Sequence, residues 1–182
     1  TQCIKIGHFP QKFRHATVIM LPKPNKDKSM VKNYRPVSLL SCIGKLLERI
    51  LKTRILSHLR QNNLLNNFQY GFLPGKSTAE HLFRLSQDIH NGFKRTQFTI
   101  AVFLDIEGAF DTVFIPGVIH KLRNFNLPGN IIAFISSFLK ERSFCVKVGN
   151  YKSRRVYPES GTPQGSVLSP LLFNLFTNDI PV

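Results

Sequence analysis

The chain has 182 residues, of which 25 are lysine or arginine and 10 are aspartate or glutamate, so its formal net charge is +15. A hydrophobic content of 42% excludes a disordered chain and is typical of a folded protein with a buried core. Three widely spaced cysteines exclude a zinc pattern and a disulfide framework, and no apolar run is long enough to cross a membrane. These features predict an intracellular protein, of the nucleus or the cytoplasm, without a membrane partner.

The positive charge is concentrated near the N-terminus. Residues 1–60 contain thirteen lysines and arginines against Asp27 and Glu48, a balance of +11. So one-sided a balance is more typical of a polyanion-binding protein than of an ordinary solvated surface. The basic residues fall on several different elements, which favours nucleic acid over an anionic membrane as the partner.

The first elements in chain order are two strands and a helix. Residues 16–21 and 34–40 are predicted strands of a hairpin whose long tip, 23–32, is rich in lysine. Apolar residues then recur at helical spacing over 42–61 and predict an amphipathic helix. Its apolar stripe is Ile43, Leu46, Leu47, Ile50, Leu51 and Ile55, and its polar face is Lys45, Glu48, Arg49 and Lys52.

The remaining elements mix helices and strands. Ser77 and Glu80 form a capping box for a helix that runs toward residue 93, and residues 98–104 are a predicted buried strand. Pro116 and Pro128 each mark the start of a helix. The other predicted segments are a hairpin of 144–148 and 154–157, a loop at 161–165 and a helix over 167–180. Because strands and helices do not alternate strictly, the sequence predicts an α+β fold.

Three of the ten acidic residues follow the predicted buried strand, in the segment FLDIEGAFDTV. A carboxylate at the end of a buried strand is costly unless a positive group meets it, so Asp105 is predicted to hold a divalent metal ion. The same pattern does not decide whether Glu107 belongs to the site or points to solvent. It slightly favours Asp111 as a cap of the next helix. Acidic residues on a basic field favour phosphoryl transfer on nucleic acid.

The loop 161–166, GTPQGS, has two readings. One is an ordinary turn with a helix cap, and the other is a glycine backbone that lets Gln164 lie flat against a base or sugar. Taken in order, the blocks NYRPVSLLS, QYGFLPGKST, FLDIEGAFDTV and GTPQGSVLSPLLFNLFTNDI resemble the reverse transcriptases of non-LTR retrotransposons, the jockey-like elements especially.

The resemblance implies the fingers and part of the palm of a right-hand polymerase. It assigns residues 1–97 to the fingers and 98–182 to a partial palm, which together form one incomplete domain. The family's Tyr-x-Asp-Asp hairpin and thumb are missing from this sequence, so the chain is interpreted as a C-terminally truncated fragment. With half of a two-ion Mg²⁺ site, the chain alone is expected to be inactive.

The resemblance also assigns roles to single residues. Asp105 matches the catalytic, metal-binding aspartate, with the Ile106 carbonyl as a further ligand. Phe110 matches the aromatic steric gate that excludes the 2′-OH of a ribonucleotide. Gln164 and Gly165 match the block that contacts the incoming nucleotide and the template.

Two basic residues complete the implied nucleotide site, because Lys23 and Arg35 resemble the fingers residues that hold the triphosphate. The predicted function is RNA-directed DNA polymerisation, in which the full-length parent adds a dNTP to the 3′-OH of a DNA primer on an RNA template. No protein partner is inferred. The alternatives are a catalytically dead nucleic-acid-binding remnant and a metal-dependent nuclease.

Overall fold

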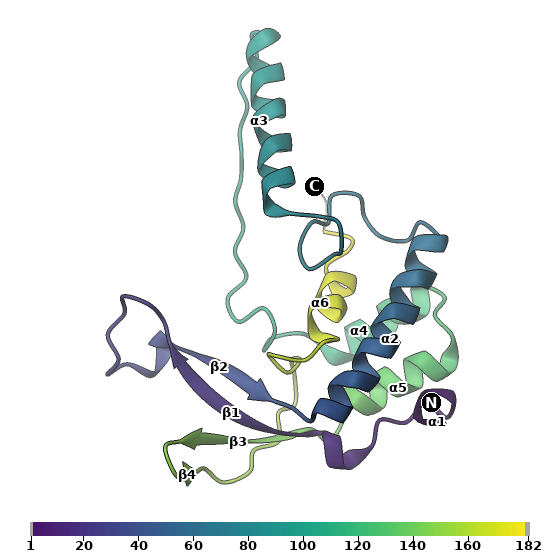
Figure 1. The fold of residues 1–182 in the computed structure, drawn as a ribbon. Helices are drawn as coiled ribbons and strands as arrows, with labels where there is room; N and C mark the ends of the chain where they lie inside the picture. Colours follow the sequence, from purple (N-terminus) through teal and green to yellow (C-terminus); the bar gives the residue numbers. More distant parts are fainter. Residues whose placement is uncertain (1, 181–182) are drawn as a thin grey trace.

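Residues 2–180 are described by a computed structural model, in which a small sheet and a group of helices lie side by side (Figure 1). The sheet has the order β2-β1-β3-β4. Strands β1 (His15–Pro22) and β2 (Tyr34–Leu39) form the predicted antiparallel hairpin. Strand β3 (Ser143–Val148) pairs with β1 in parallel and with β4 (Tyr151–Lys152) antiparallel. The predicted mixture of helices and strands is therefore confirmed.

The sheet joins segments that are far apart in the sequence. Val18 in the middle of β1 pairs with Ser38 on one side and with Val146 on the other. One sheet thus contains strands from residues 1–97 and from residues 98–182. The division of the chain into a fingers part and a palm part stays a prediction.

Five helices lie beside the sheet (Figure 1). They are α1 (Gln2–Lys5), α2 (Cys42–Gln61), α4 (Ile115–Asn124), α5 (Gly129–Leu139) and α6 (Ser169–Phe176), with 3₁₀ turns at Gln11–Phe13 and Val31–Asn33. The predicted helix starts are confirmed, since Pro116 lies in the first turn of α4 and Pro128 is the N-cap of α5. Helix α6 is shorter than the predicted 167–180.

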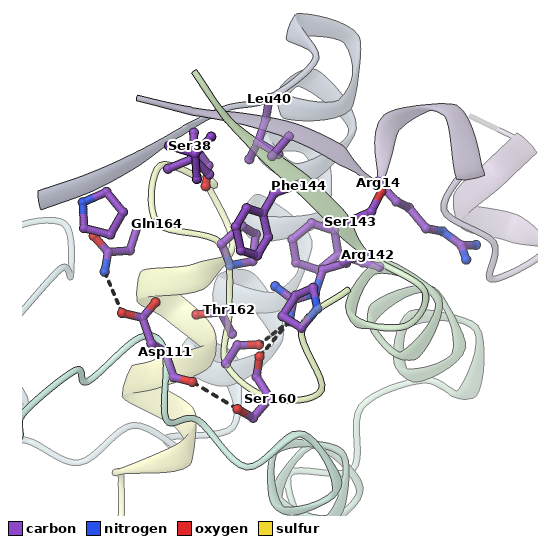
Figure 2. A pocket seen from close by; sticks show the side chains of 18 of the residues that line it. Arg14, Ser38, Leu40, Asp111, Arg142, Ser143, Phe144, Ser160, Thr162 and Gln164 are labelled. Carbon is purple, nitrogen blue, oxygen red and sulfur yellow. Dashed lines mark hydrogen bonds between the residues drawn. The ribbon is translucent and has the colours of Figure 1, made fainter. Parts of the chain in front are cut away.

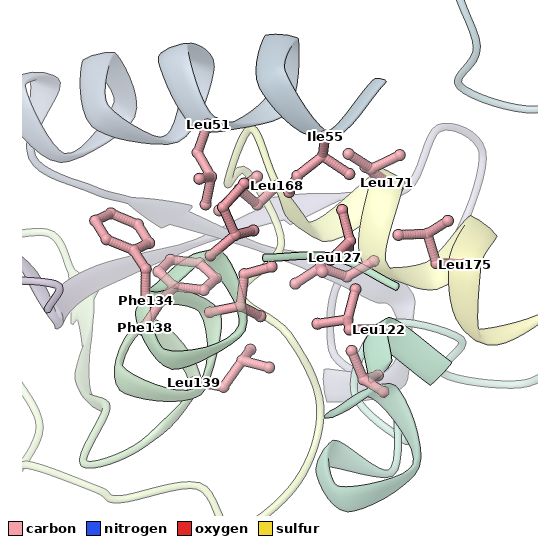
Figure 3. Packing of buried hydrophobic residues seen from close by; sticks show 14 of the residues in the cluster. Leu51, Ile55, Leu122, Leu127, Phe134, Phe138, Leu139, Leu168, Leu171 and Leu175 are labelled. Carbon is pink, nitrogen blue, oxygen red and sulfur yellow. The ribbon is translucent and has the colours of Figure 1, made fainter. Parts of the chain in front are cut away.

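The core lies between α2, α4, α5 and α6. Leu51 and Ile55 of α2 face Phe134 of α5 and Leu168 and Leu171 at the start of α6 (Figure 3), and all five are fully buried. Burying such side chains contributes roughly 1.5–3 kcal/mol each. This packing fixes α6, and the loop that leads into it, against α2.

The bounds of α2 are those predicted, and its buried face is predicted in part, since Leu51 and Ile55 are buried and Leu47 and Ile50 pack against the core. Ile43 and Leu46, placed in the apolar stripe, are 60% and 57% exposed, whereas Glu48, placed on the polar face, is buried. The buried positions are Gly44, Glu48, Leu51, Ile55, Leu56 and Leu59. A stripe at 44, 48, 51, 55 and 59 has regular helical spacing, so the error came from excluding a charged residue from the core side.

Helix α3 (Thr78–Lys94) stands away from the remainder of the molecule, and the chain after it runs back alongside it (Figure 1). The predicted cap is present, because the Ser77 hydroxyl accepts a 3.2 Å hydrogen bond from the Glu80 amide. None of the α3 residues is fully buried.

The predicted buried strand 98–104 is wrong. Its residues form no regular structure and are exposed, and the exposed fractions of its large apolar side chains run from 78% at Val102 to 100% at Phe98. A strand needs a neighbour for its backbone hydrogen bonds, and residues 2–180 provide none for this segment. We call residues 78–107 the arm. Within the described part of the chain, no helix is long and apolar enough to cross a membrane.

Candidate functional site

The glycine-flanked loop at 161–165, which is predicted to contact a nucleotide, packs against residues 110–113 of the acidic segment FLDIEGAFDTV (Figure 2). The Thr162 amide donates to the Phe110 carbonyl at 2.6 Å, and the Gly161 amide donates to the Val113 carbonyl at 2.9 Å. The Ser160 hydroxyl donates to the Asp111 carbonyl at 3.2 Å. Sequence motifs that are about fifty residues apart thus form one local structure.

The side chain of Gln164 lies at the edge of this structure. Its amide nitrogen donates to a carboxylate oxygen of Asp111 at 3.1 Å (Figure 2). The Gln164 carbonyl in turn accepts a 2.9 Å hydrogen bond from the Ser38 amide of β2. Asp111 does not cap α4, whose N-cap is Phe114 with no side-chain hydrogen bond. The predicted capping role of Asp111 is therefore wrong, and its carboxylate instead orients Gln164.

Two glycines make these close contacts possible. Gly161 has a φ of +77°, and a Cβ there would lie 2.5 Å from the Asp111 carbonyl oxygen. Gly165 has a φ of +102°, and its Cβ would lie 2.9 Å from the Ser38 carbonyl oxygen. Neither position accepts a side chain without moving backbone on the facing segment.

A cavity of about 470 Å³ opens between this loop and the sheet. That volume falls within the range of roughly 300–1,000 Å³ that small-ligand sites occupy. Alternate residues of three strands form its floor, among them Ala16, Val18, Met20, Pro36, Ser38, Phe144 and Val146. Gln164 and Asp111 are at its rim, so polar groups stand beside a mostly apolar hollow (Figure 2).

Phe110 is half-buried beside this loop. Its ring lies 5.9 Å from that of Phe72 and 5.6 Å from that of Phe173, measured between centroids. Aromatic pairs at such distances are worth roughly 0.5–1.5 kcal/mol beyond the area they bury. The ring is therefore held in place by contacts from two other parts of the chain.

Two buried charged residues that the sequence analysis did not select hold the two ends of this loop. Glu48 of α2 accepts hydrogen bonds from residues 166–168, and Arg142 donates to the carbonyls of residues 160 and 161. Burial raises the pKa of Glu48, against the opposing effect of its hydrogen bonds and of Lys45. Burial also lowers the pKa of Arg142 to about 10.

The other two acidic residues of the segment FLDIEGAFDTV lie at the end of the arm. Asp105 and Glu107 are exposed, and Ile106 is 48% exposed. Carboxylate and carbonyl oxygens are the donors that Mg²⁺ prefers. Within residues 2–180, however, no three His, Cys, Asp or Glu side chains converge on one point. The assignment of Asp105 and the Ile106 carbonyl as metal ligands stays a prediction.

Lys23 follows directly on β1 and Arg35 belongs to β2, so both lie near the tip of the hairpin. The register pairs Leu21 with Arg35, and the Lys23 amide continues the ladder with a 2.8 Å bond to the Asn33 carbonyl. Residues 21, 23 and 35 thus share one face of the hairpin, and Lys23 and Arg35 are diagonal neighbours. This face is opposite to the one that forms the cavity floor, because side chains alternate along a strand.

The sequence matches the family described as "Reverse transcriptase (RNA-dependent DNA polymerase)" over residues 21–181. It is 36% identical to the "Probable RNA-directed DNA polymerase from transposon BS" of Drosophila melanogaster over 98% of this chain and 20% of that protein. It is also 36% identical to the polymerase of the mobile element jockey from the same species, over 98% of this chain and 19% of that protein. A third relative, from transposon X-element, is 33% identical over 98% and 20%.

The chain spans about a fifth of the length of these relatives. Their printed names are those of RNA-directed DNA polymerases. The chain belongs to the reverse transcriptase (RNA-dependent DNA polymerase) family, and its relatives include the jockey-like and other non-LTR retrotransposon enzymes.

Proposed function

We propose that this chain contributes the nucleotide- and template-binding part of an RNA-directed DNA polymerase, with residues 1–97 as fingers and 98–182 as part of the palm. The reaction is the addition of a dNTP to the 3′-OH of a DNA primer on an RNA template. The observation that carries the proposal is the packing of residues 160–165 on residues 110–113, next to a cavity of about 470 Å³. Both packed segments belong to motifs that resemble the family.

In this proposal Gln164 and Gly165 contact the incoming nucleotide and the template. The Gln164 side chain is already oriented by Asp111, and Gly165 lets the backbone lie close to β2. Phe110 acts as the steric gate against a ribose 2′-OH. Its contacts with Phe72 and Phe173 give the ring the fixed position that such a gate requires.

Lys23 and Arg35 are proposed to hold the triphosphate outside the cavity, because their face of the hairpin is opposite to the cavity floor. Their diagonal placement puts an ammonium and a planar guanidinium on one face of the hairpin, a combination suited to a polyphosphate, and the Lys23 ammonium donates to the Lys32 carbonyl at 3.0 Å. The adjoining tip carries Lys26, Lys28 and Lys32 and supports binding of the template–primer backbone.

Asp105 is proposed as the catalytic carboxylate, with the Ile106 carbonyl as a further Mg²⁺ ligand. The proposal for Asp105 rests on its position in the motif FLDIEGAFD and on its accessibility on the arm.

The test is a chimaera in which this chain replaces the matching segment of the jockey polymerase, which we call the jockey chimaera. Primer extension on an RNA template should be detectable, and Asp105→Asn should abolish it while RNA binding remains. The matched control is Asp88→Asn, which removes an exposed carboxylate elsewhere on the arm. Activity of the Asp105→Asn protein within a few-fold of the parent would contradict the assignment.

A further inference from the structure

Glu48 is the most buried charged residue in the described part of the chain, with 1% of its surface exposed. A single carboxylate oxygen, Oε2, accepts three hydrogen bonds: from the Ser166 hydroxyl at 2.5 Å, from the Val167 amide at 2.7 Å and from the Leu168 amide at 3.1 Å. All three donors belong to the turn that leads into α6. An ionised carboxylate is the acceptor best suited to such a cluster of donors.

The Ser166 hydroxyl extends this contact into α6. Its oxygen accepts from the amides of Leu168 at 3.1 Å and Ser169 at 3.2 Å, while the Ser169 hydroxyl donates back to the Pro163 carbonyl at 2.9 Å. The first turn of α6 and the end of the loop are therefore tied together, and Glu48 ties both to α2.

Arg142 donates hydrogen bonds to backbone carbonyls at the other end of the loop. It is 7% exposed, and its Nη2 donates to the carbonyls of Ser160 at 3.1 Å and Gly161 at 2.7 Å. Its Nε donates to the Leu139 carbonyl at 3.1 Å, which anchors the guanidinium to the end of α5. Among residues 2–180 no carboxylate forms an ion pair with Arg142, so its charge is directed at backbone carbonyls.

Charge-assisted hydrogen bonds are roughly twice as strong as neutral ones, but burying a charge is costly. A turn that needed only to be compact would be held by neutral groups. Here two opposite buried charges are used on one short loop, one for its carbonyls and one for its amides. Gln164 and Gly165 lie between them, and the Ser38 amide holds the centre at 2.9 Å.

We propose that Glu48 and Arg142 are positioning residues, which hold residues 160–168 in the conformation that presents Gln164 and Gly165 to the incoming nucleotide. The role in nucleotide binding rests on the proposed function. The physical gain is preorganisation, because a loop that is already ordered does not lose conformational entropy when the ligand binds.

The test uses the 182-residue chain and the variants Glu48→Gln, Glu48→Ala and Arg142→Lys. The control is Glu141→Gln, which removes the neighbouring exposed carboxylate that pairs with Arg14 and touches no part of the loop. Amide hydrogen exchange of Val167 and Leu168 should be accelerated about tenfold in Glu48→Gln and further in Glu48→Ala, with α5 amides unchanged. Arg142→Lys should instead accelerate exchange at residues 161 and 162.

Binding provides the second readout, with an RNA template annealed to a dideoxy-terminated DNA primer and the complementary dNTP as probes. The Kd for the dNTP should rise about tenfold in Glu48→Gln. The Kd for the primer–template should change less than about twofold, because the proposed phosphate contacts of the hairpin supply most of that affinity and outweigh the template contact of Gln164 and Gly165. If the two residues only stabilised the fold, the variants would weaken the binding of dNTP and of primer–template together, or would weaken neither.

Each outcome decides the inference. Unchanged exchange at residues 161–168 in all three variants would show that the charges do not hold the loop. Faster exchange with an unchanged dNTP Kd would refute the positioning role. A wild-type chain that binds primer–template but no dNTP would refute the proposed nucleotide role, and the exchange data would still show whether the loop is held. Should Glu48→Ala fail to fold, Glu48→Gln carries the test alone.

Discussion

Replacing Gly161 by alanine should disturb the centre of the candidate site, and its cost can be separated into two parts. The first is the backbone conformation, since φ is +77° and a residue with a Cβ loses roughly 1–2 kcal/mol there. The second is contact, because the new Cβ would lie 2.5 Å from the Asp111 carbonyl oxygen and 2.8 Å from its carbonyl carbon. These are backbone atoms, so they cannot rotate out of the way.

A second glycine, Gly75, allows the cost of the backbone conformation to be measured without the cost of the contact. Gly75 has almost the same φ, +81°, but nothing lies within 4 Å of the position its Cβ would take. Alanine also lowers the entropy of the unfolded chain, which offsets about 0.4–1 kcal/mol. Gly75→Ala should therefore cost about 1 kcal/mol in the free energy of unfolding. Gly161→Ala should cost about 2–4 kcal/mol, because the overpacking adds roughly 1–3 kcal/mol.

Urea unfolding of both variants and the wild type, followed by far-UV circular dichroism, measures these costs. Equal m-values would show that the extent of unfolding is the same in all three. If the two alanine variants lost the same stability to within about 0.5 kcal/mol, the contact between residue 161 and Asp111 would not be a constraint on the fold.

Three further predictions address the gate, the charge and the pH dependence. In the jockey chimaera, Phe110→Val should raise the ratio of ribonucleotide to deoxyribonucleotide incorporation, whereas a packing role alone would cost about 1–4 kcal/mol of stability and leave that ratio unchanged. Lys26→Ala combined with Lys28→Ala should weaken RNA binding by the chain and reduce the slope of log K against log salt by about two; an unchanged slope would place the phosphate contacts elsewhere. Burial raises the pKa of Glu48, so its carboxyl loses a proton less readily in the folded chain than in the unfolded chain. The free energy of unfolding should therefore fall as the pH rises from the unfolded-state pKa through the raised folded-state pKa, above which the carboxylate that accepts the three hydrogen bonds is ionised. Glu48→Gln should remove this fall in the free energy of unfolding, as measured by urea titrations at several pH values. If the difference in the free energy of unfolding between wild type and variant were constant with pH, the pKa of Glu48 would not be raised by folding.

Local signals in the sequence predicted most of the elements. The 3.6-residue spacing gave the bounds of α2, the Ser77 hydroxyl gave the start of α3, and Pro116 and Pro128 gave the starts of α4 and α5. Each of these signals acts within one turn of a helix. They depend little on what the remainder of the chain does.

The errors concern interactions between distant parts of the chain. Periodicity assigns residues 98–104 to a strand, but a strand exists only where a neighbour completes its hydrogen bonds. The burial of Glu48 depends on donors about 120 residues away, and the pairing of Gln164 with Asp111 spans 53 residues. No pattern within α2 or within the loop shows that these partners exist.

The exposed stretch Phe98–Leu104 also bears on the tendency of the chain to aggregate. Seven consecutive residues without a charge, a proline or a glycine have the composition of a segment that stacks into cross-β assemblies. What opposes stacking is mutual repulsion between molecules of net charge +15. Salt shortens the range of that repulsion, to about 10 Å at 0.1 M. Raising the ionic strength is therefore expected to weaken the proposed binding of nucleic acid and to favour association between the chains.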